Sequence, residues 1–524
     1  MVYTDVLVDW AHLLYLVCFL TAAKAVGFFI VTVYAYFPFP ALLDRFYLAS
    51  QGLQSWFSYQ LGGAAPGSAG KASPNGNRER LLAESLVEGT PFILETHTAL
   101  TRDGFVLVLH RLVPKTSGQD GPGAPGQATS SSTSETYVED RGPQRGRSWR
   151  KVSGESNGRK SGGGSQSLQQ HIPTSSFFSK GPGSAAAPAV APALPSAAVP
   201  TVTGTESNAV TPLTPGRPPL LMVHALMQDS ESFLCGGEEH SLALVLAKAG
   251  FDVWLGNNRG NRYSHKHVSL SPSQDAYWNF SIDELARFDV PAMVDYVLRA
   301  TGQEKLAYVG FSQGSAQAFA AFTTDLAMAK KVSLFLALAA PPRAKGLSSS
   351  YLSALVESNP RFIYLVFGRH SMLSSTLMWM KIMSPQLFVW TVDRATDFLF
   401  NWSNSQVSAA RKVGLYQHIF SYASVKTVVQ WFQLIRLRRL AFYSDDSNRN
   451  RVPVEYDLKR LRVPVAVFYG GKDTVIDISA LRDVLPACIR WHMEPEYEHL
   501  DMIWADTAKD NVFPELVKLL HEYS

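Results

Sequence analysis

The stretch Ala307-Tyr308-Val309-Gly310-Phe311-Ser312-Gln313-Gly314-Ser315-Ala316 decides the fold of this chain. The apolar residues at its start predict a buried strand, and the alanine-rich residues from Ser315 to Phe322 predict a helix. Gly310 and Gly314 flank Ser312 between these two elements, in the pattern G-x-S-x-G. A strand that turns sharply into a helix brings its backbone segments almost into contact, so the residues two before and two after the serine must be small. The pattern therefore predicts a strained turn that presents the Ser312 hydroxyl at the edge of a sheet.

Strand-like and helix-like segments alternate on both sides of this turn. Such alternation favours βαβ units and a mostly parallel sheet, which is the α/β class with helices flanking a central sheet. An earlier β-hairpin is predicted by two apolar runs around Asp103-Gly104. The predicted strands are 91–100, 105–113, 219–224, 251–255, 306–309, 332–340, 463–469 and 489–493, and the predicted helices are 241–249, 282–300 and 315–322.

Ser312 becomes a nucleophile only if a histidine acts as its base and a carboxylate orients that base. In a sheet of this kind the three groups follow the chain order serine, acid, histidine. Asp473 lies directly after strand 463–469, at the sheet edge where ligands bind, and His499 lies on a loop after the next strand. Asp477 is the rival acid, but it falls after the turn, where the next helix begins. We therefore predict a catalytic triad of Ser312, Asp473 and His499.

Several other histidines fit the base less well, because they lie within predicted strands or helices or precede the serine; among them are His224, His265, His267, His418, His492 and His521. An oxyanion hole needs two N–H donors aimed at the developing charge. In this architecture one donor is the backbone N–H of the residue after the nucleophile, here Gln313. The other comes from the loop after an earlier strand, here Ala225-Leu226.

The N-terminal residues predict contact with a membrane. Residues 13–39 are almost entirely apolar or aromatic, and a run of about 25 such residues spans a bilayer as a helix. A cleaved signal peptide is disfavoured by the length of the run and by Asp5 and Asp9, which stand where basic residues are expected. Lys24 would cost about 2.5 kcal/mol or more at mid-bilayer, so a re-entrant hairpin in one leaflet or in a lipid-droplet monolayer stays open. A buried core helix is the remaining alternative.

Composition limits the other functions. The 524 residues carry a formal net charge of only +4 and no concentrated basic face in the apolar-rich parts, which argues against a nucleic-acid partner. The three cysteines, Cys18, Cys235 and Cys488, are too few and too scattered for a disulfide framework or a zinc site. We expect no metal or cofactor.

The domain organisation follows from shifts in composition. Residues 115–217 are dominated by small and polar residues and predict a disordered insertion. Residues 341–451 are rich in aromatic and aliphatic residues without βα periodicity, and they predict a helical cap over an apolar site. The predicted segments are a membrane anchor (1–48), a linker and entry segment (49–90), the start of a hydrolase core (91–114), the insertion (115–217), the core with the nucleophile (218–340), the cap (341–451) and the core with acid and base (452–524).

Longer motifs carry a family resemblance. The chain resembles the acid lipase and cholesteryl esterase family of α/β-hydrolases, and most closely its fungal, membrane-anchored steryl ester hydrolases. The resemblance covers most of the chain outside the N-terminal run and the insertion. The matching stretches are D-V-W-L-G-N-N-R-G-N at 252–261, Y-S at 263–264, H-V-S-L-S-P at 267–272, G-F-S-Q-G at 310–314, G-G-K-D at 470–473 and H-L-D-M-I-W-A at 499–505.

The resemblance implies Ser312 as nucleophile, Asp473 as acid, His499 as base, and Leu226 and Gln313 as oxyanion donors. Two positions depart from the family pattern. Ala225 stands where glycine is usual, and a positive φ there would strain an alanine. Phe311 replaces the histidine of the animal enzymes, as in the fungal branch.

Together these observations predict a membrane-anchored serine esterase that cleaves steryl esters, with triacylglycerol lipase activity as the alternative. Less favoured are a lipid acyltransferase, which would transfer the acyl group to an added sterol, and an inactive lipid-binding protein. Basic residues from Arg45 onward favour a cytosolic catalytic part. The expected location is the surface of a lipid droplet, the endoplasmic reticulum or the plasma membrane, and the sequence does not indicate which proteins the chain binds.

Overall fold

The computed structural model describes residues 83–115, 216–344, 353, 356–372, 377, 380, 383–445, 452–485 and 488–523. The predicted membrane segment, most of the predicted linker and all but the ends of the predicted insertion lie outside these residues. Within the described ranges, no helix combines the length and the apolar character needed to cross a membrane.

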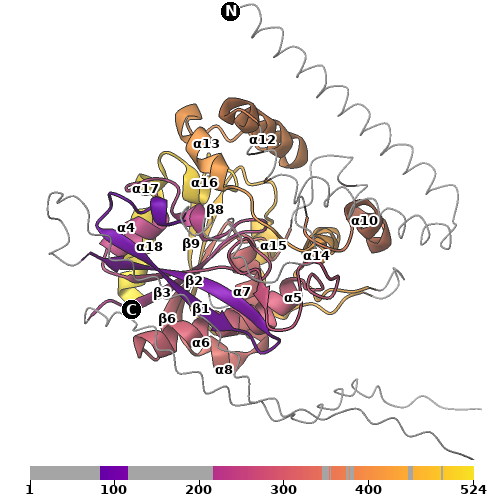
Figure 1. Ribbon diagram of the computed structural model, residues 1–524, viewed down its shortest axis with the longest axis horizontal. Coiled ribbons are helices and arrows are strands. Elements are labelled where there is room, and N and C mark those ends of the chain that lie inside the picture. The colour runs from indigo at the N-terminus through magenta and orange to yellow at the C-terminus, as the bar shows by residue number, and fades with distance from the viewer. Residues whose placement is uncertain are drawn as a thin grey trace, which may run out of the picture. The chain divides into compact units, whose positions relative to one another are not determined.

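A nine-stranded sheet runs through the described residues (Figure 1). Its order is β1-β2-β4-β3-β6-β7-β8-β9, with β5 paired to β2. The pairs β1–β2, β2–β4 and β2–β5 are antiparallel, and every pair from β4 along to β9 is parallel. The prediction of a mostly parallel sheet is therefore confirmed. The strands are β1 (Phe92–Leu100), β2 (Phe105–Pro114), β3 (Pro219–Val223), β4 (Asp252–Gly256), β5 (Lys266–His267), β6 (Leu306–Phe311), β7 (Val332–Leu338), β8 (Val465–Gly470) and β9 (Cys488–Glu494).

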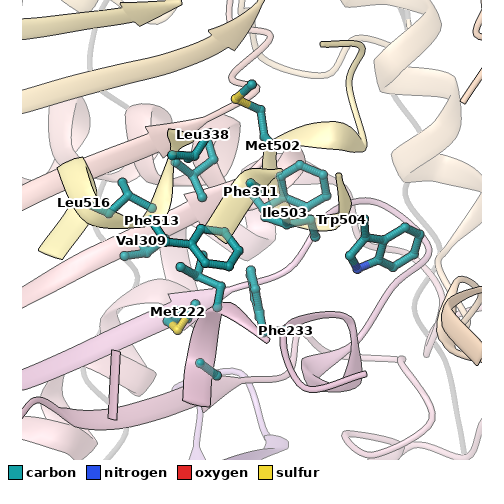
Figure 2. Packing of buried hydrophobic residues seen from close by; sticks show 14 of the residues in the cluster. Met222, Phe233, Val309, Phe311, Leu338, Met502, Ile503, Trp504, Phe513 and Leu516 are labelled. Atoms are coloured by element: carbon teal, nitrogen blue, oxygen red, sulfur yellow. The ribbon is translucent and has the colours of Figure 1, made fainter. Parts of the chain in front are cut away.

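Helices cover both faces of the sheet because its central strands are apolar on both sides. Every residue of β3, β4, β6 and β8 is buried, as expected for parallel strands between two helical layers. One core contains α4 (Leu242–Lys248) and α18 (Phe513–Tyr523), and the other contains α6 (Val290–Thr301) and α7 (Gln313–Thr324). Figure 2 shows the first core, where Val309 and Leu338 of the sheet lie beside Leu516 of α18.

The helix predicted over 282–300 is interrupted. The structure has α5 (Ile282–Glu284), a π-helical stretch η2 (Leu285–Asp289) and then α6. Pro291 near the start of α6 has no N–H for a regular helical bond, and the buried Asp289 carboxylate accepts from the Arg259 backbone N–H at 2.9 Å and from its Nε at 2.7 Å. The apolar periodicity predicted a single helix, whereas a distant arginine and a proline favour a local change of pitch.

The segment between β7 and β8 is helical where the structure describes it. Its helices are α10 (Pro360–Phe367), α12 (Pro385–Phe400), α13 (Ala409–Leu415), η3 (Tyr416–His418) and α14 (Val425–Leu437). We call residues 341–451 the cap insertion below. The shorter elements elsewhere are η1 (Ser230–Phe233), α8 (Leu326–Ala329), η4 (Leu458–Arg460), α15 (Ile478–Arg482), α16 (Asp501–Trp504) and α17 (Ala508–Asn511).

Candidate active site

Ser312 occupies a strained turn between β6 and α7. Its backbone has φ 51° and ψ −110°, outside the regions that L-residues ordinarily adopt. A Cβ added at Gly310 would lie 2.6 Å from the Ser315 nitrogen, and one added at Gly314 would collide with the carbonyl oxygen of Val223. Gly310 is therefore required by the strand–helix contact that the sequence suggested, whereas Gly314 is required by the end of the neighbouring strand β3.

The structure brings the three predicted triad residues together. The Ser312 Oγ lies 2.7 Å from Nε2 of His499, and Nδ1 of the same ring lies 2.7 Å from Oδ2 of Asp473. All three residues are buried. The other carboxylate oxygen of Asp473 accepts from the Val475 N–H at 2.9 Å, which fixes the carboxylate. These contacts can move a proton from hydroxyl to imidazole while the carboxylate stabilises the charged ring.

The loops that carry the acid and the base are held together through their backbones. A Cβ at Gly470 would collide with the Tyr497 carbonyl oxygen, and one at Gly471 would lie 2.5 Å from that of Pro495. Asp477, the rival acid, caps α15 by accepting from the Ala480 N–H at 3.0 Å. The rival carboxylate therefore has the structural role that its place at a helix start suggested.

The other histidines are engaged away from the serine. His492 pairs with Glu494 at 2.9 Å, His418 pairs with Glu231 at 2.7 Å, and the Phe251 and His521 ring centroids lie 4.8 Å apart. His265 Nδ1 donates to the Asn261 carbonyl oxygen at 3.1 Å, and His267 Nε2 donates to that of Asp103 at 2.9 Å.

The loop after β3 carries the second predicted oxyanion donor and answers the question of strain at Ala225. Its positive φ falls on Met227, at 59°, and not on Ala225. Alanine therefore causes no left-handed strain where the family usually has glycine. The cap insertion holds this loop, because the Ser421 N–H donates to the Met227 carbonyl oxygen at 2.6 Å. The cap insertion also reaches the first predicted donor, since Trp431 Nε1 donates to the Gln313 side-chain Oε1 at 2.9 Å.

The buried His224 ring braces the same loop from the sheet side. Its Nδ1 lies 2.8 Å from the carbonyl oxygen of Ala225, so Nδ1 carries the proton. Its Nε2 then accepts from the Asn258 N–H at 3.2 Å and from Asn261 Nδ2 at 3.3 Å. Burial lowers the pKa of His224, which keeps the ring neutral and this hydrogen-bond pattern in place.

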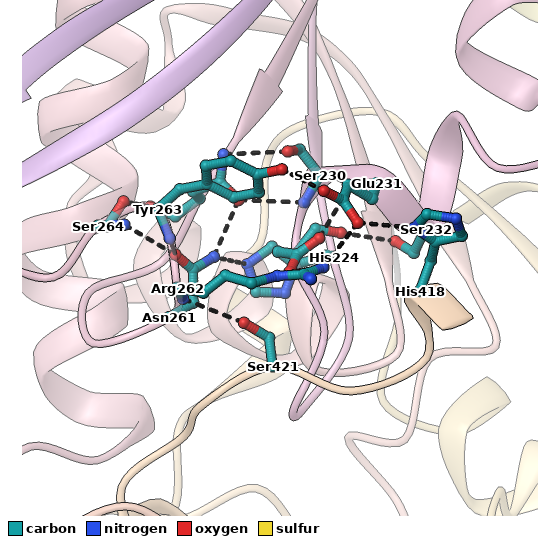
Figure 3. A network of polar contacts seen from close by, with 12 residues as sticks. His224, Ser230, Glu231, Ser232, Asn261, Arg262, Tyr263, Ser264, His418 and Ser421 are labelled. Carbon is teal, nitrogen blue, oxygen red and sulfur yellow. Dashed lines mark hydrogen bonds and ion pairs between the residues drawn. The ribbon is translucent and has the colours of Figure 1, made fainter. Parts of the chain in front are cut away.

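A buried charge network lies beside this loop (Figure 3). Asp229 and Glu231 are fully buried, and Arg262 donates to them at 2.7 and 2.6 Å. Burial alone would raise the pKa of Asp229, but the charge and hydrogen bonds of Arg262 hold it below its ordinary value. Tyr263 donates to the second oxygen of Glu231, and His418 joins from the cap insertion. The network therefore connects the loop after β3, the 256–264 loop and the cap insertion.

Two further carboxylates, Glu498 and Asp501, lie close to His499 in the chain. Glu498 accepts from the Ser403 and Asn404 N–H groups at 2.8 and 2.7 Å, which ties the end of α12 to the base loop. Asp501 accepts from the Glu498 N–H at 2.7 Å. Burial, followed by the nearby charges of Glu498 and Asp473, raises the pKa of Asp501 to about 6.

Sequence reasoning missed most of these supporting residues. The runs around Arg262 and Asp501 were matched as family motifs, but no role was assigned to their charges. A charged residue inside a buried, otherwise apolar run is a usable signal, because such a charge needs a partner. Nothing local marks Trp431, whose partner Gln313 lies more than a hundred residues away in the chain.

Known proteins that resemble this chain provide evidence that is independent of the site geometry. Residues 218–506 match the family described as α/β hydrolase fold. A probable lipase of Schizosaccharomyces pombe is 41% identical over 310 residues, which cover 57% of this chain and 70% of the relative. Rat lysosomal acid lipase/cholesteryl ester hydrolase is 35% identical over 57% of this chain and 79% of its own length. Rat gastric triacylglycerol lipase is 33% identical over 58% of this chain and 81% of its own length.

Proposed function

The chain belongs to the α/β-hydrolase family and is a carboxylic ester hydrolase, and from this premise we propose that Ser312, His499 and Asp473 are its catalytic triad. The resemblance to the acid lipase and cholesteryl esterase family is confirmed by the named relatives. One observation carries the proposal: the unbroken pair of 2.7 Å contacts from Asp473 through His499 to Ser312.

In this mechanism the Ser312 Oγ attacks the ester carbonyl carbon while its proton passes to Nε2 of His499. Asp473 keeps the other ring proton on Nδ1 and stabilises the imidazolium. The tetrahedral intermediate collapses when the bond to the alcohol oxygen breaks, and His499 gives its proton to that oxygen. Water then attacks the acyl-enzyme, again losing its proton to His499, and the free fatty acid leaves.

The backbone N–H groups of Leu226 and Gln313 are the proposed oxyanion donors. Gln313 begins α7, and the first N–H groups of a helix have no partner within it, so this one can bind the developing charge. The partial positive charge at the α7 N-terminus adds to the same effect. Leu226 precedes Met227, whose carbonyl oxygen is hydrogen-bonded to the cap insertion.

The proposed substrates are steryl esters, with triacylglycerols as the second candidate. Support for the first comes from the rat relative named as a cholesteryl ester hydrolase, and for the second from the rat gastric triacylglycerol lipase, which is about as similar. The many aromatic and aliphatic residues of the cap insertion suit a very apolar substrate. We also propose that residues 13–39 attach the enzyme to a membrane or lipid droplet, with the catalytic part in the cytosol.

The test compares full-length protein on cholesteryl oleate and triolein in matched mixed micelles. Faster cleavage of cholesteryl oleate supports the first candidate, and a strong preference for triolein overturns it. Ser312→Ala is expected to lower both activities by at least about 10⁴-fold without changing how the protein fractionates with membranes. Substantial activity in this variant would mean that the nucleophile is a different residue.

A further inference from the structure

Trp402, directly after α12, stacks on the ring of the proposed base. The ring centroids of Trp402 and His499 lie 5.1 Å apart, and the planes differ by only 7°, an offset face-to-face arrangement. Trp402 is 6% exposed, so solvent is largely excluded from this stack. In the sequence, nothing distinguishes this tryptophan from the other aromatic residues of the cap insertion.

The position of Trp402 is determined from three directions. Its Nε1 donates to Thr474 Oγ1 at 3.2 Å, one residue after Asp473. The Phe400 ring stacks with it at 4.4 Å. The next two backbone N–H groups along the chain donate to Glu498, the residue before His499. The tryptophan is therefore attached to both the acid loop and the base loop.

The face of an aromatic ring carries partial negative charge and attracts a cation within about 6 Å of its centroid. His499 becomes such a cation each time it takes a proton from Ser312 or from water. Phe311 also approaches the ring, but at 5.8 Å and a tilt of 40°, so its face is less well directed. Among the described aromatic residues, Trp402 presents its face most nearly parallel to the imidazole.

We propose that Trp402 is a positioning residue of the reaction, whose ring face stabilises the imidazolium form of His499 and so lowers the barrier to serine attack. The inference rests on the catalytic roles proposed above. Loss of the ring would raise the free energy of protonated His499 equally in the free enzyme and in the transition state. The base would then stay unprotonated to lower pH, but each attack would be slower.

This double effect gives a distinctive pH profile. For Trp402→Leu, we expect kcat/KM for p-nitrophenyl butyrate to fall about 5- to 30-fold on the neutral plateau. The acid limb should move down by about 0.7 to 1.5 pH units, so that the variant and wild-type profiles converge at low pH. Trp402→Phe keeps a ring face and should lie between them. Phe400→Leu is the matched control, because it removes a ring that stacks on Trp402 but leaves the Trp402 ring itself against His499.

Other charges face the base and must be separated from this effect. Asp473 contacts Nδ1, Glu498 is adjacent in the chain, and burial raises the pKa of the nearby Asp501 to about 6. The profiles are therefore measured again in an Asp501→Asn background, where the difference made by Trp402→Leu should persist. Circular dichroism melting shows whether Trp402→Leu folds, and Trp402→Phe serves if it does not.

A Trp402→Leu profile that is lowered equally at every pH, with an unmoved acid limb, would overturn the proposal, since loss of packing alone predicts it. An unchanged profile would also overturn it. The soluble ester makes the result independent of whether the natural substrate is a steryl ester or a triacylglycerol. Failure of the catalytic assignment itself would appear separately, as activity retained by Ser312→Ala.

Discussion

The hydrolase core and the cap insertion both reach the triad, but they do so with different parts of the chain. The core places Ser312, Asp473 and His499 through backbone features, namely the glycines at which two segments almost touch. The cap insertion adds two side-chain contacts, Trp402 on His499 and Trp431 on Gln313, to the backbone hydrogen bonds that it makes with the neighbouring loops. The core therefore decides whether the reaction can occur, and the cap insertion adjusts how well the reacting groups perform.

The largest effect is expected when the acid of the core is changed. Asp473→Asn should lower kcat by about 10⁴-fold, because an amide can donate to Nδ1 and favour the tautomer that cannot accept the serine proton. Steady-state kinetics with a soluble ester measures this. Asp477→Asn is the matched control, since asparagine also caps a helix, and it should stay within about twofold of wild type. A reversed pair of results would make Asp477 the acid.

The next effect concerns the network that joins the core to the cap insertion. Arg262→Met leaves Asp229 and Glu231 buried without their cation, and we expect it to lower the free energy of unfolding by about 3–5 kcal/mol. Urea unfolding followed by fluorescence measures the loss. Arg394→Met removes an exposed arginine paired at 3.7 Å and should change stability by less than about 0.5 kcal/mol. Equal losses in the two variants would contradict a structural role for the network.

A pH-dependent effect is expected from Asp501, beside the base. Burial raises its pKa from an ordinary value of 3.8 to about 6, so the folded state binds this proton more tightly than the unfolded state. Its contribution to stability is therefore greatest below about pH 4 and falls as pH rises to about 6. Asp501→Asn lacks this fall, and relative to wild type it should gain about 2–3 kcal/mol between pH 4 and 7. Urea unfolding at four pH values measures the difference, and a constant offset would disprove the assignment.

The smallest effect is expected in the cap insertion. Trp431→Phe removes the hydrogen bond to Gln313 and should lower kcat about 3- to 10-fold with little change in KM, since the donor next to the nucleophile is less firmly held. Gln313→Leu removes the other partner while keeping the backbone N–H. The double variant should lose little more than either single variant, and fully additive losses would show that the two side chains act separately.

Sequence patterns predicted the core well because its signals are local. The G-x-S-x-G spacing, the strand before Gly470-Gly471 and the capping position of Asp477 are each recognised from residues within a few positions of one another, although the contacts that exclude a side chain at Gly314, Gly470 and Gly471 come from more distant residues. The break in the helix over 282–300 was not predicted, because it depends on Arg259, a residue outside that segment, as well as on Pro291 within it. The condition for strain at Ala225 is not met, because the positive φ lies two residues later, on Met227, whose carbonyl oxygen accepts from the cap insertion.

The amino-acid sequence by itself determined the parallel sheet, the turn at Ser312 and the candidates for acid and base, since apolar periodicity, glycine spacing and chain order act over short distances. Only the tertiary structure decided which cap side chains meet those groups. The stack of Trp402 on His499 joins residues nearly a hundred positions apart, and no short-range pattern records such a contact. The two rings meet because the buried Glu498 carboxylate, next to His499, needs hydrogen-bond donors. The backbone N–H groups that follow Trp402 supply them from a distant part of the chain.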